Sequence, residues 1–556
     1  MIHTVKTLTD TAMHTRDWWK GAVIYEIYPL SFKDTDGDGY GDLPGIIEKL
    51  SYVASLGVDA IWVCPFFKSP MRDFGYDVSD YCAVDPLFGC AADVTRLIDL
   101  AHGLGLKVIF DMVPCHTSNE HPWFREGRVS TNNANHDWYI WADAKPDGSP
   151  PNNWLSIFGG VAWTWEPRRR QYYFHSVLSS QPALNVCNRE VLAALLAVMQ
   201  YWYDKGVDGF RLDAITALAP DQDLRNNPPI PKNEPPAYID GGGGNPFLKQ
   251  VHLFDRDTPG VLPILRAFGD LADSYDPPRF LFAEIGDVDG AVVGAKYAQP
   301  KHVHAAFIQD LILSELSAAR AAKILSRVSQ VMGEAWTFNA FGSHDIARQV
   351  SRWGAIGGEI GDRKQIAKLL MALLLSMRGC ACIYQGEELG LTDVDLAYEA
   401  IRDPWGLTLY PDYKGRDSCR TPMPWTDSAA NAGFTVGTPW LPLGQDHLKM
   451  AVNVQDVDPD SVLNAYRKFL DWRKRYPSIL YGAMKVLDVQ PPCLAFLRTL
   501  EHQKMLFVFN LSNDHAVWKL RGRWQMAEGH GLKSARESEG QLHFTGLDVY
   551  IGYQGI

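Results

Sequence analysis

The sequence lacks paired cysteines, long apolar runs and an excess of positive charge. Its nine cysteines are scattered and odd in number, without any C-x-x-C spacing, which predicts unpaired thiols in a reducing cytoplasm. Residues 1–15 are polar and mixed, without the apolar stretch of a secretory signal. The most apolar helical run, 368–377, is too short to span a bilayer. We therefore expect a cytoplasmic protein with no membrane segment.

Several functional classes are excluded by missing motifs or by charge. The formal net charge of −12 argues against nucleic acid as a partner. Neither the H-E-x-x-H zinc pattern nor the G-x-S-x-G turn of serine esterases occurs, so we assign neither chemistry. What the sequence does contain is 46% hydrophobic residues and 18 tryptophans. This composition suits a large core and also suits sugar stacking.

Strand-like runs alternate with helical patterns over most of the 556 residues. Strands that alternate with helices are parallel, and eight of them closing on themselves form a (β/α)₈ TIM barrel. A doubly wound sheet is the alternative, but no Gly-rich nucleotide turn follows the first strand. The predicted strands are 22–28, 59–65, 107–113, 209–213, 280–285, 306–311, 338–342 and 380–384, and the predicted helices are 44–56, 93–104, 189–205, 263–274, 363–377 and 461–476.

Three long irregular segments, 116–188, 214–259 and 387–440, follow predicted strands three, four and eight. All three extend from the strand ends where barrel enzymes build their sites. After the last predicted helix the pattern changes to short strand-like runs. We therefore predict a barrel over 1–115 and 188–477 with an inserted loop at 214–259 over the site, an inserted domain over 116–187, and a C-terminal β-sandwich domain over 478–556.

The stretch 206–215 (GVDGFRLDAI) reads as a short strand that ends in a carboxylate, Asp213. Residues two apart on a strand point to the same face, so Arg211 and Asp213 project together. The guanidinium can hold the carboxylate ionised. An ionised carboxylate at a strand end can act as a nucleophile, although an isolated Arg-x-Asp is more often a structural pair.

An acidic loop follows the first predicted strand. Carboxylates alternate with glycines over 34–42 (DTDGDGYGD), which lets a tight loop wrap oxygen atoms around a hard cation. The loop lacks the twelfth-position Glu and the flanking helices of an EF-hand, and an acidic turn without metal is the alternative. We predict a structural divalent cation on Asp34, Asp36, Asp38, Tyr40 and Asp42.

Six motifs in order resemble those of the α-amylase family of glycoside hydrolases, within its branch of α-glucosidases and oligo-1,6-glucosidases. They are 75–81 (GYDVSDY), 111–116 (DMVPCH), 209–213 (GFRLD), 282–285 (FAEI), 343–345 (SHD) and 415–425 (GRDSCRTPMPW). The resemblance runs from about Trp18 to the end of the chain, and it implies Ca²⁺, or else Mg²⁺, as the cation of the acidic loop. It implies a retaining mechanism with Asp213 as nucleophile, Glu284 as acid/base and Asp345 as a third carboxylate that binds two sugar hydroxyls. Retention requires this pair of carboxyl groups about 5–5.5 Å apart, and the acid needs a raised pKa.

The resemblance also implies the substrate contacts. His116 and His344 would donate to sugar hydroxyls, Asp77 and Arg416 would grip a terminal glucose, and Tyr76 would stack on its ring. Ala214 follows the nucleophile at a position where related enzymes that cleave α-1,6 links have Val, so we expect α-1,4 disaccharides such as maltose, or sucrose, to be preferred. The chain departs from the family pattern at Cys115, Ala183 and Ser343, where Asn, Asp and Asn are usual.

We therefore expect a retaining, exo-acting α-glucosidase with some glucosyl transfer, present as monomer or homodimer. An oligo-1,6-glucosidase or a trehalose-related enzyme is the nearer alternative. A catalytically weakened binding homologue is the more distant one, and the presence of all three carboxylates argues against it.

Overall fold

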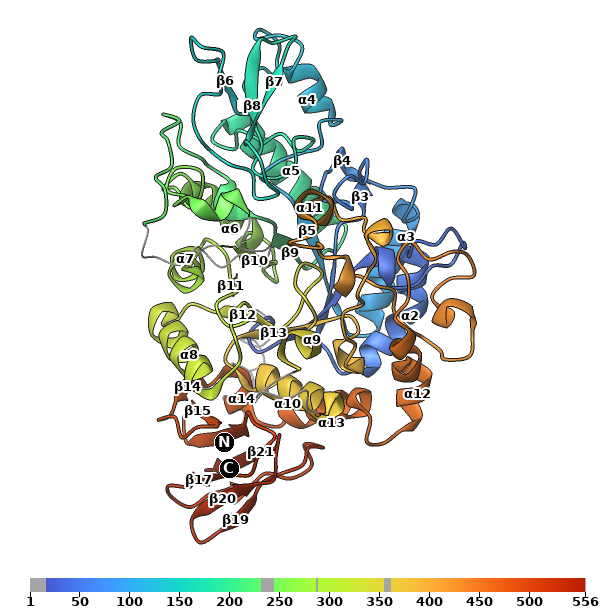
Figure 1. Ribbon diagram of the computed structural model, residues 1–556, viewed down its shortest axis with the longest axis vertical. Helices are drawn as coiled ribbons and strands as arrows, with labels where there is room; N and C mark the ends of the chain where they lie inside the picture. The colour runs from blue at the N-terminus through green and yellow to red at the C-terminus, as the bar shows by residue number, and fades with distance from the viewer. Residues whose placement is uncertain (1–16, 232–244, 287–288, 355–361, 556) are drawn as a thin grey trace.

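The computed structural model of the chain describes residues 17–231, 245–286, 289–354 and 362–555. Eight parallel strands close into a barrel at its centre (Figure 1). In chain order they are β1 (Val23–Ile27), β2 (Ala60–Val63), β5 (Lys107–Met112), β9 (Gly209–Leu212), β10 (Phe280–Ile285), β11 (Ala305–Ile308), β12 (Thr337–Ala340) and β13 (Cys380–Tyr384). Each pairs with its sequence neighbours and β13 closes on β1, which confirms the predicted barrel.

The barrel strands are apolar because side chains on both of their faces are covered. β1, β2, β9 and β13 are buried at every position, as expected for a parallel sheet wrapped by helices. Aromatic side chains fill the interior. Phe282 and Phe338 stack with ring centroids 3.9 Å apart, and Trp62 meets Phe282 edge-on at 5.6 Å. The barrel is therefore a packed core, and function has to be placed at its rim.

The six predicted helices are present as α2 (Leu43–Ser55), α3 (Ala91–Gly103), α5 (Arg189–Asp204), α6 (Val261–Asp273), α10 (Arg363–Ser376) and α13 (Val462–Arg473). Two longer barrel helices were not predicted. α7 (Gly290–Tyr297) contains two glycines and little amphipathic contrast, so its sequence carries a weak helical signal. α8 (Ala318–Met332) has a clear helical signal in the sequence, because Ser317 is a favourable N-cap residue. In the structure its side chain accepts a hydrogen bond from Arg320 N.

Small additions crowd the C-terminal ends of the strands. A hairpin of β3 (Phe67–Lys68) and β4 (Asp80–Val84) follows β2. After β5 come α4 (Pro122–Gly127) and a three-stranded sheet of β6 (Trp141–Ala142), β7 (Trp163–Glu166) and β8 (Gln171–Phe174), which stands at the top of Figure 1. The predicted loop over 214–259 contains 3₁₀ turns at Ile215–Ala217 and Pro246–Lys249, and its glycines 241–244 lie outside the described residues.

A short helix α9 (Gln349–Trp353) lies between β12 and β13. The segment after β13 passes the barrel rim and contains the short helices α11 (Pro404–Leu409) and α12 (Val452–Val457). Beyond α13, α14 (Pro477–Tyr481) leads into two antiparallel sheets. One joins β14 (Ala483–Val486), β15 (Cys493–Leu500), β16 (Gln503–Asn510), β21 (Val549–Gln554) and β18 (Gln525–Met526), and the other joins β17 (Ala516–Lys519), β20 (Gln541–Phe544) and β19 (Arg536–Ser538).

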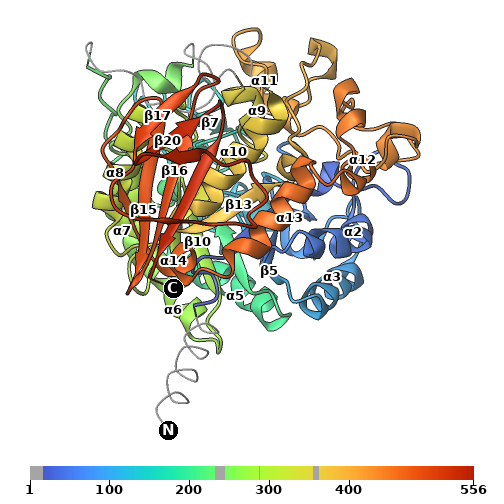
Figure 2. The same cartoon turned by 90° about the horizontal axis from the view of Figure 1, so that it is seen from below.

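The two C-terminal sheets enclose a separate apolar cluster that includes Trp518, Leu542 and Tyr550. In Figure 2, which is seen from below, the sheets lie in front of the barrel, where β14 and β15 contact α8 and β16 contacts α10. They lie at the opposite end of the molecule from the inserted sheet (Figure 1). All nine cysteines are free thiols. No helix in the described ranges combines the length and apolar character needed to cross a membrane.

Candidate active site

A pocket opens among the loops at the C-terminal ends of the barrel strands. Asp213, Glu284 and Asp345 all line it. They come from the end of β9, from within β10 and from the turn after β12, so the barrel brings together three carboxylates that are far apart in sequence. Four other predicted site residues also line the pocket: Tyr76, His116, Ala214 and Arg416. Arg211 and His344 are buried behind its surface.

Arg211 is the charge centre of the site. Its Nη1 donates to Asp213 Oδ1 at 2.6 Å and to Asp111 Oδ1 at 2.8 Å, while its Nη2 lies 2.7 Å from Glu284 Oε2. The guanidinium is 1% exposed. A buried cation needs such partners, because an unpaired charge away from water is very costly. The predicted Arg211–Asp213 pair is present, and Glu284 forms an ion pair with the same guanidinium.

Asp213 and Glu284 are therefore electrostatically coupled. Burial raises the pKa of the Asp213 carboxyl well above its ordinary value and the negative charge of Glu284 raises it further, against the lowering effect of Arg211. Ala214 N also donates to Glu284 Oε2 at 3.1 Å, so the backbone next to one carboxylate holds the other in place.

The Asp345 carboxylate is surrounded by three positively charged side chains. Its Oδ1 accepts from Arg416 Nη1 at 2.9 Å and from Arg420 Nη2 at 2.8 Å, and its Oδ2 lies 3.1 Å from His344 Nε2. Burial raises the pKa of Asp345, but His344, Arg416 and Arg420 outweigh burial and hold the pKa well below its ordinary value. Asp345 is therefore ionised across the neutral range.

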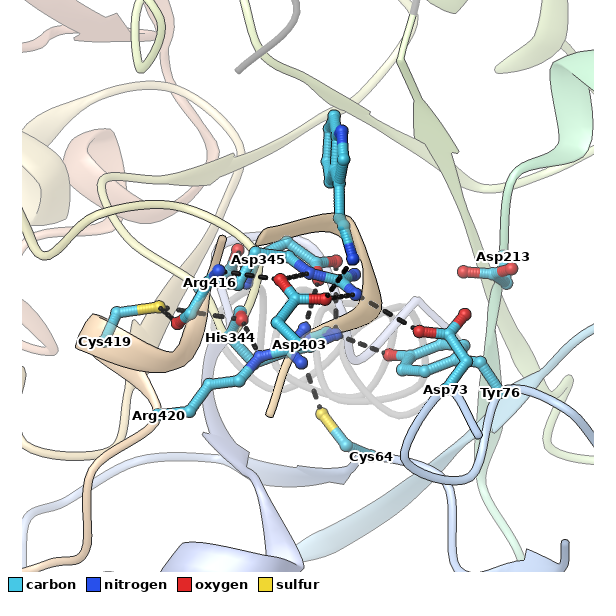
Figure 3. A network of polar contacts seen from close by, with 12 residues as sticks. Cys64, Asp73, Tyr76, Asp213, His344, Asp345, Asp403, Arg416, Cys419 and Arg420 are labelled. Atoms are coloured by element: carbon cyan, nitrogen blue, oxygen red, sulfur yellow. Dashed lines mark hydrogen bonds and ion pairs between the residues drawn. The ribbon is translucent and has the colours of Figure 1, made fainter. Parts of the chain in front are cut away.

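The partner of Arg416 at the closed side of the pocket is Asp73 and not Asp77 as predicted. Arg416 Nη2 donates to Asp73 Oδ1 at 3.1 Å and to Asp403 Oδ1 at 2.8 Å, as Figure 3 shows. Asp77 is fully buried and does not line the pocket. It accepts from Ser69 Oγ, Arg72 N and Asp73 N within its own turn. The sequence contained the signal for Asp73 in a carboxylate two residues before the Gly75-Tyr76 pair.

Aromatic rings close the remaining walls. Phe158 and Trp405 stack with centroids 5.1 Å apart, and Arg416 lies over both rings. Neither residue was predicted, because each belongs to a long loop whose path the sequence pattern does not define. Tyr76 presents its hydroxyl to His344 Nε2 at 2.6 Å and to Asp111 Oδ2 at 3.2 Å. The aromatic walls and the carboxylates together suit a sugar ring.

His116 and Ala214 occupy special positions beside the trio. Burial lowers the pKa of His116 to about 4, so its imidazole is neutral at pH 7. Its Nε2 lies 3.2 Å from the Tyr76 carbonyl oxygen, and its Nδ1 has no hydrogen-bond partner among the described residues. Ala214 has φ +46°, a left-handed conformation that side chains rarely adopt. Its Cβ lines the pocket next to the nucleophile candidate.

The three departures from the family pattern are accommodated in different ways. The Cys115 thiol donates to the carbonyl oxygens of Asp213 at 3.1 Å and Ala214 at 3.2 Å. Ser343 Oγ accepts from Asp345 N at 3.1 Å. Ala183 is buried in the apolar cluster of the inserted sheet. Cys115 and Ser343 therefore still hold the backbone that carries Asp213 and Asp345.

The acidic loop lies outside the pocket. Oxygen atoms of Asp34, Asp36 and Asp42 lie within 4.8 Å of one another, a hard donor set that fits a divalent cation. Asp38 and Tyr40, which were predicted as ligands, stand outside this group, and the Tyr40 ring stacks on Trp440. Asp34 is already held by Gly37 N, Gly39 N and the Thr435 hydroxyl, so the loop is preformed.

Residues 26–482 match the family described as "Alpha amylase, catalytic domain". A probable alpha-glucosidase of Rhizobium meliloti (strain 1021) is 47% identical over 523 residues, which are 93% of this chain and 94% of that protein. An oligo-1,6-glucosidase of Parageobacillus thermoglucosidasius is 36% identical over 94% of this chain and 97% of that protein. The crystal structure of the alpha-glucosyl transfer enzyme XgtA superposes with a TM-score of 0.93, at 48% identity, over 96% of this chain and 99% of that one.

Proposed function

Because the chain belongs to the alpha-amylase family of glycoside hydrolases, we propose that it is a retaining, exo-acting α-glucosidase that removes terminal α-linked glucose. The observation that carries the proposal is Arg211, which holds Asp213 and Glu284 on one guanidinium at the edge of a sugar-sized pocket. Two carboxyl groups held this close together fit retention, in which one attacks the sugar directly. In this proposal Asp213 is the nucleophile and Glu284 the acid/base, as the sequence resemblance implies.

In the proposed reaction an oxygen of Asp213 attacks the anomeric carbon while the bond to the leaving oxygen breaks. Glu284 gives its proton to that oxygen, then takes a proton from the water that cleaves the glucosyl ester. The product keeps the α configuration because two inversions occur. General acid catalysis requires that Glu284 carries a proton when the substrate binds. Arg211 stabilises the carboxylate form of Asp213 before attack.

Exo action is supported by the closed side of the pocket. Asp345, Arg416 and Asp73 form a continuous charged chain there, and charge-assisted hydrogen bonds to terminal hydroxyls are stronger than neutral ones. The stacked rings of Phe158 and Trp405 lie beside Arg416 at this side of the pocket, which supports a closed inner end. One terminal glucose is therefore the expected occupant of the inner subsite.

The preferred bond is proposed to be the α-1,4 link of maltose or the bond of sucrose, since Ala214 leaves space on the acceptor side. Glucosyl transfer to other acceptors is a second activity, supported by the 48% identity to an alpha-glucosyl transfer enzyme. The 36% identity to an oligo-1,6-glucosidase keeps α-1,6 cleavage or trehalose-related activity as the competing hypothesis. A purely sugar-binding protein would not need the acid pair on Arg211.

A divalent cation, Ca²⁺ or Mg²⁺, is proposed on Asp34, Asp36 and Asp42, with Asp38 and Tyr40 as further ligands after a local adjustment. Its role would be structural, because the loop lies outside the pocket. The oligomeric state is proposed to be monomer or homodimer.

The deciding experiment is a substrate panel of maltose, sucrose, isomaltose, trehalose and p-nitrophenyl α-glucoside, with the first product anomer followed by proton NMR. We expect α-glucose to appear first, maltose or sucrose to be cleaved best, and soluble starch to release glucose without long fragments. Release of β-glucose would contradict retention, and rapid internal cleavage of starch would contradict exo action. Preference for isomaltose would favour the α-1,6 alternative.

A further inference from the structure

Glu26 is a fully buried carboxylate near the C-terminal end of β1 that does not line the pocket. Its Oε1 lies 2.5 Å from His344 Nδ1 and accepts from His344 N at 3.2 Å. The two residues are 318 positions apart in the chain. A carboxylate is seldom buried without a role or a partner, and the main partner here belongs to the family motif that carries Asp345.

His344 is held between oxygen atoms on both sides of its ring. Nδ1 faces Glu26, while Nε2 faces Tyr76 Oη at 2.6 Å and Asp345 Oδ2 at 3.1 Å. The rings of Tyr28 and Tyr76 lie nearly parallel to the imidazole, at centroid distances of 5.5 and 5.4 Å. Aromatic faces attract cations. Both ring nitrogens can donate to carboxylates only when the imidazole carries two protons.

We propose that Glu26 is a positioning residue that keeps His344 doubly protonated, so that the Nε2–H of His344 orients the Asp345 carboxylate toward the sugar. The inference rests on the proposed glycosidase function and adds a residue that touches no substrate. Without the Nδ1 partner, a buried imidazole would give up a proton readily, since burial disfavours the charged form. Asp345 would then lose one of its three positive neighbours.

Asp345 and Cys64 also act on His344. Burial lowers the pKa of His344, whereas Asp345, which faces Nε2, and Cys64 raise it well above its ordinary value. The thiol of Cys64 lies 3.5 Å from Nδ1, and burial keeps that thiol protonated by raising its pKa to about 12. Among described residues the remaining titratable or charged groups facing this ring are Tyr28, Tyr76, Asp111, Asp345, Arg416 and Arg420, with Cys382 behind Glu26. Glu26 is the carboxylate on the Nδ1 side.

The test compares Glu26→Gln with Glu388→Gln. Glu388 is equally buried but accepts from the hydroxyls of Tyr25 and Tyr52 and from Gly386 N, so its variant controls for removal of a buried charge. The readout is kcat/KM for p-nitrophenyl α-glucoside as a function of pH. In Glu26→Gln we expect the alkaline limb to move to lower pH by about one unit or more, since an adjacent carboxylate shifts a pKa by about 1–3 units. Turnover should fall about tenfold or more at neutral pH, whereas Glu388→Gln keeps the wild-type profile.

An unchanged profile for Glu26→Gln, or an equal shift in Glu388→Gln, would overturn the inference. If Glu26→Gln does not fold, the wild-type protein still decides the matter. With ¹⁵N-labelled histidine, His344 assigned through His344→Gln should show two protonated ring nitrogens at neutral pH, and one protonated nitrogen would contradict it. The side chains of Glu26, Cys64 and His344 could also hold a metal. A stoichiometric metal bound there would therefore contradict the inference that Glu26 keeps His344 doubly protonated. Failure of the proposed function looks different, since wild-type protein would then cleave none of the panel.

Discussion

Arg211 decides how the two central carboxyl groups behave. One buried guanidinium contacts Asp111, Asp213 and Glu284 at 2.6–2.8 Å. Burial above all, and then the negative charges of Glu284 and Asp111, keep the pKa of Asp213 high despite its direct contact with an arginine. Arg211 therefore fixes the relative positions of the proposed nucleophile Asp213 and the proposed acid Glu284.

Replacement of Glu284 by Gln should lower kcat for maltose by about 10²–10⁴-fold, the usual contribution of a general acid. For p-nitrophenyl α-glucoside, whose leaving group needs no proton, the first step should be affected much less. Asp213→Asn should abolish turnover of both substrates, because the covalent step is lost. Steady-state and burst kinetics measure these effects. Near-wild-type maltose turnover by either variant would refute the assignments.

Asp73 and Asp77 provide a matched pair of substitutions. Burial raises the pKa of Asp73 to about 6, with Arg416 and Gln181 acting in the opposite direction. Its ionised form, which can bind glucose hydroxyls, is therefore lost as the pH falls through about 6. We expect KM for maltose to rise below pH 6 in the wild type. Asp73→Asn should raise KM at every pH and remove this dependence.

Asp77→Asn should leave KM unchanged and lower the melting temperature. The reason is that Asp77 accepts from two backbone amides and a hydroxyl inside its own turn. An effect of Asp77→Asn on KM equal to that of Asp73→Asn would mean that the two carboxylates act together on the substrate.

Ala214→Val tests the linkage preference. Val is stiff at χ1 and would protrude into the acceptor side, so the ratio of kcat/KM for isomaltose to maltose should rise about 10–200-fold. The left-handed backbone at Ala214 (φ +46°) means that Val also adds strain and lowers stability. The ratio is independent of the amount of folded enzyme, so it separates the two effects. An unmoved ratio would contradict the steric argument.

At the level of whole segments, the acidic loop after β1 connects distant parts of the chain. Asp34 N donates to Phe434 O, and the Thr435 hydroxyl donates to Asp34 Oδ2. Gly39 has φ +97°, and a Cβ there would lie 2.0 Å from Thr438 O, so the close approach requires glycine. The segment that this loop anchors also carries Arg416 and the pocket wall.

Removal of divalent cations should lower the melting temperature, because an ion that binds only the folded state stabilises it, by about 2.7 kcal/mol at 100 times its Kd. Activity per folded molecule should change little, since the loop lies outside the pocket. Asp36→Asn should reproduce the loss and make the protein insensitive to chelator. An unchanged melting curve after metal removal confirmed by elemental analysis would exclude the site.

On the scale of the molecule, one arginine joins the C-terminal sheets to the barrel. Arg498 of β15 is fully buried and donates to the carbonyl oxygens of Ser376 and Met377, at the end of α10, and of Gly482. A cation at the C-terminal end of a helix is favourable. Hydrogen bonds from charged groups contribute about 1.5–3 kcal/mol each, so this contact is a substantial part of the interface.

Arg498→Met should therefore lower the free energy of unfolding by about 3 kcal/mol or more, and scanning calorimetry should show the C-terminal sheets melting ahead of the barrel. Arg475→Met is the control, because Arg475 is exposed and pairs with exposed Asp471, and such pairs contribute little. Equal melting curves for the two variants would contradict a role for Arg498 in the interface.

The periodicity of the sequence was sufficient to predict the barrel and the end of the barrel that carries the site. Parallel strands require helical crossovers, so alternating patterns imply the closed sheet, and strand ends imply where Asp213, Glu284 and Asp345 meet. Helix α7 was missed because its two glycines and weak amphipathic contrast hide it. The β3–β4 hairpin was missed because β3 has only two residues, too few to show a period.

Contacts made by irregular segments were decided by the tertiary structure alone. Asp73 and Arg416 are 343 positions apart, and Glu26 and His344 are 318 apart. No local pattern distinguishes Asp73 from Asp77, because the choice depends on which carboxylate its own turn already satisfies. The sequence by itself determined which chemical groups reach the barrel rim, since strand period and end are local properties. Which of them pair depends on loop paths and side-chain directions, and these are set only when the whole chain packs.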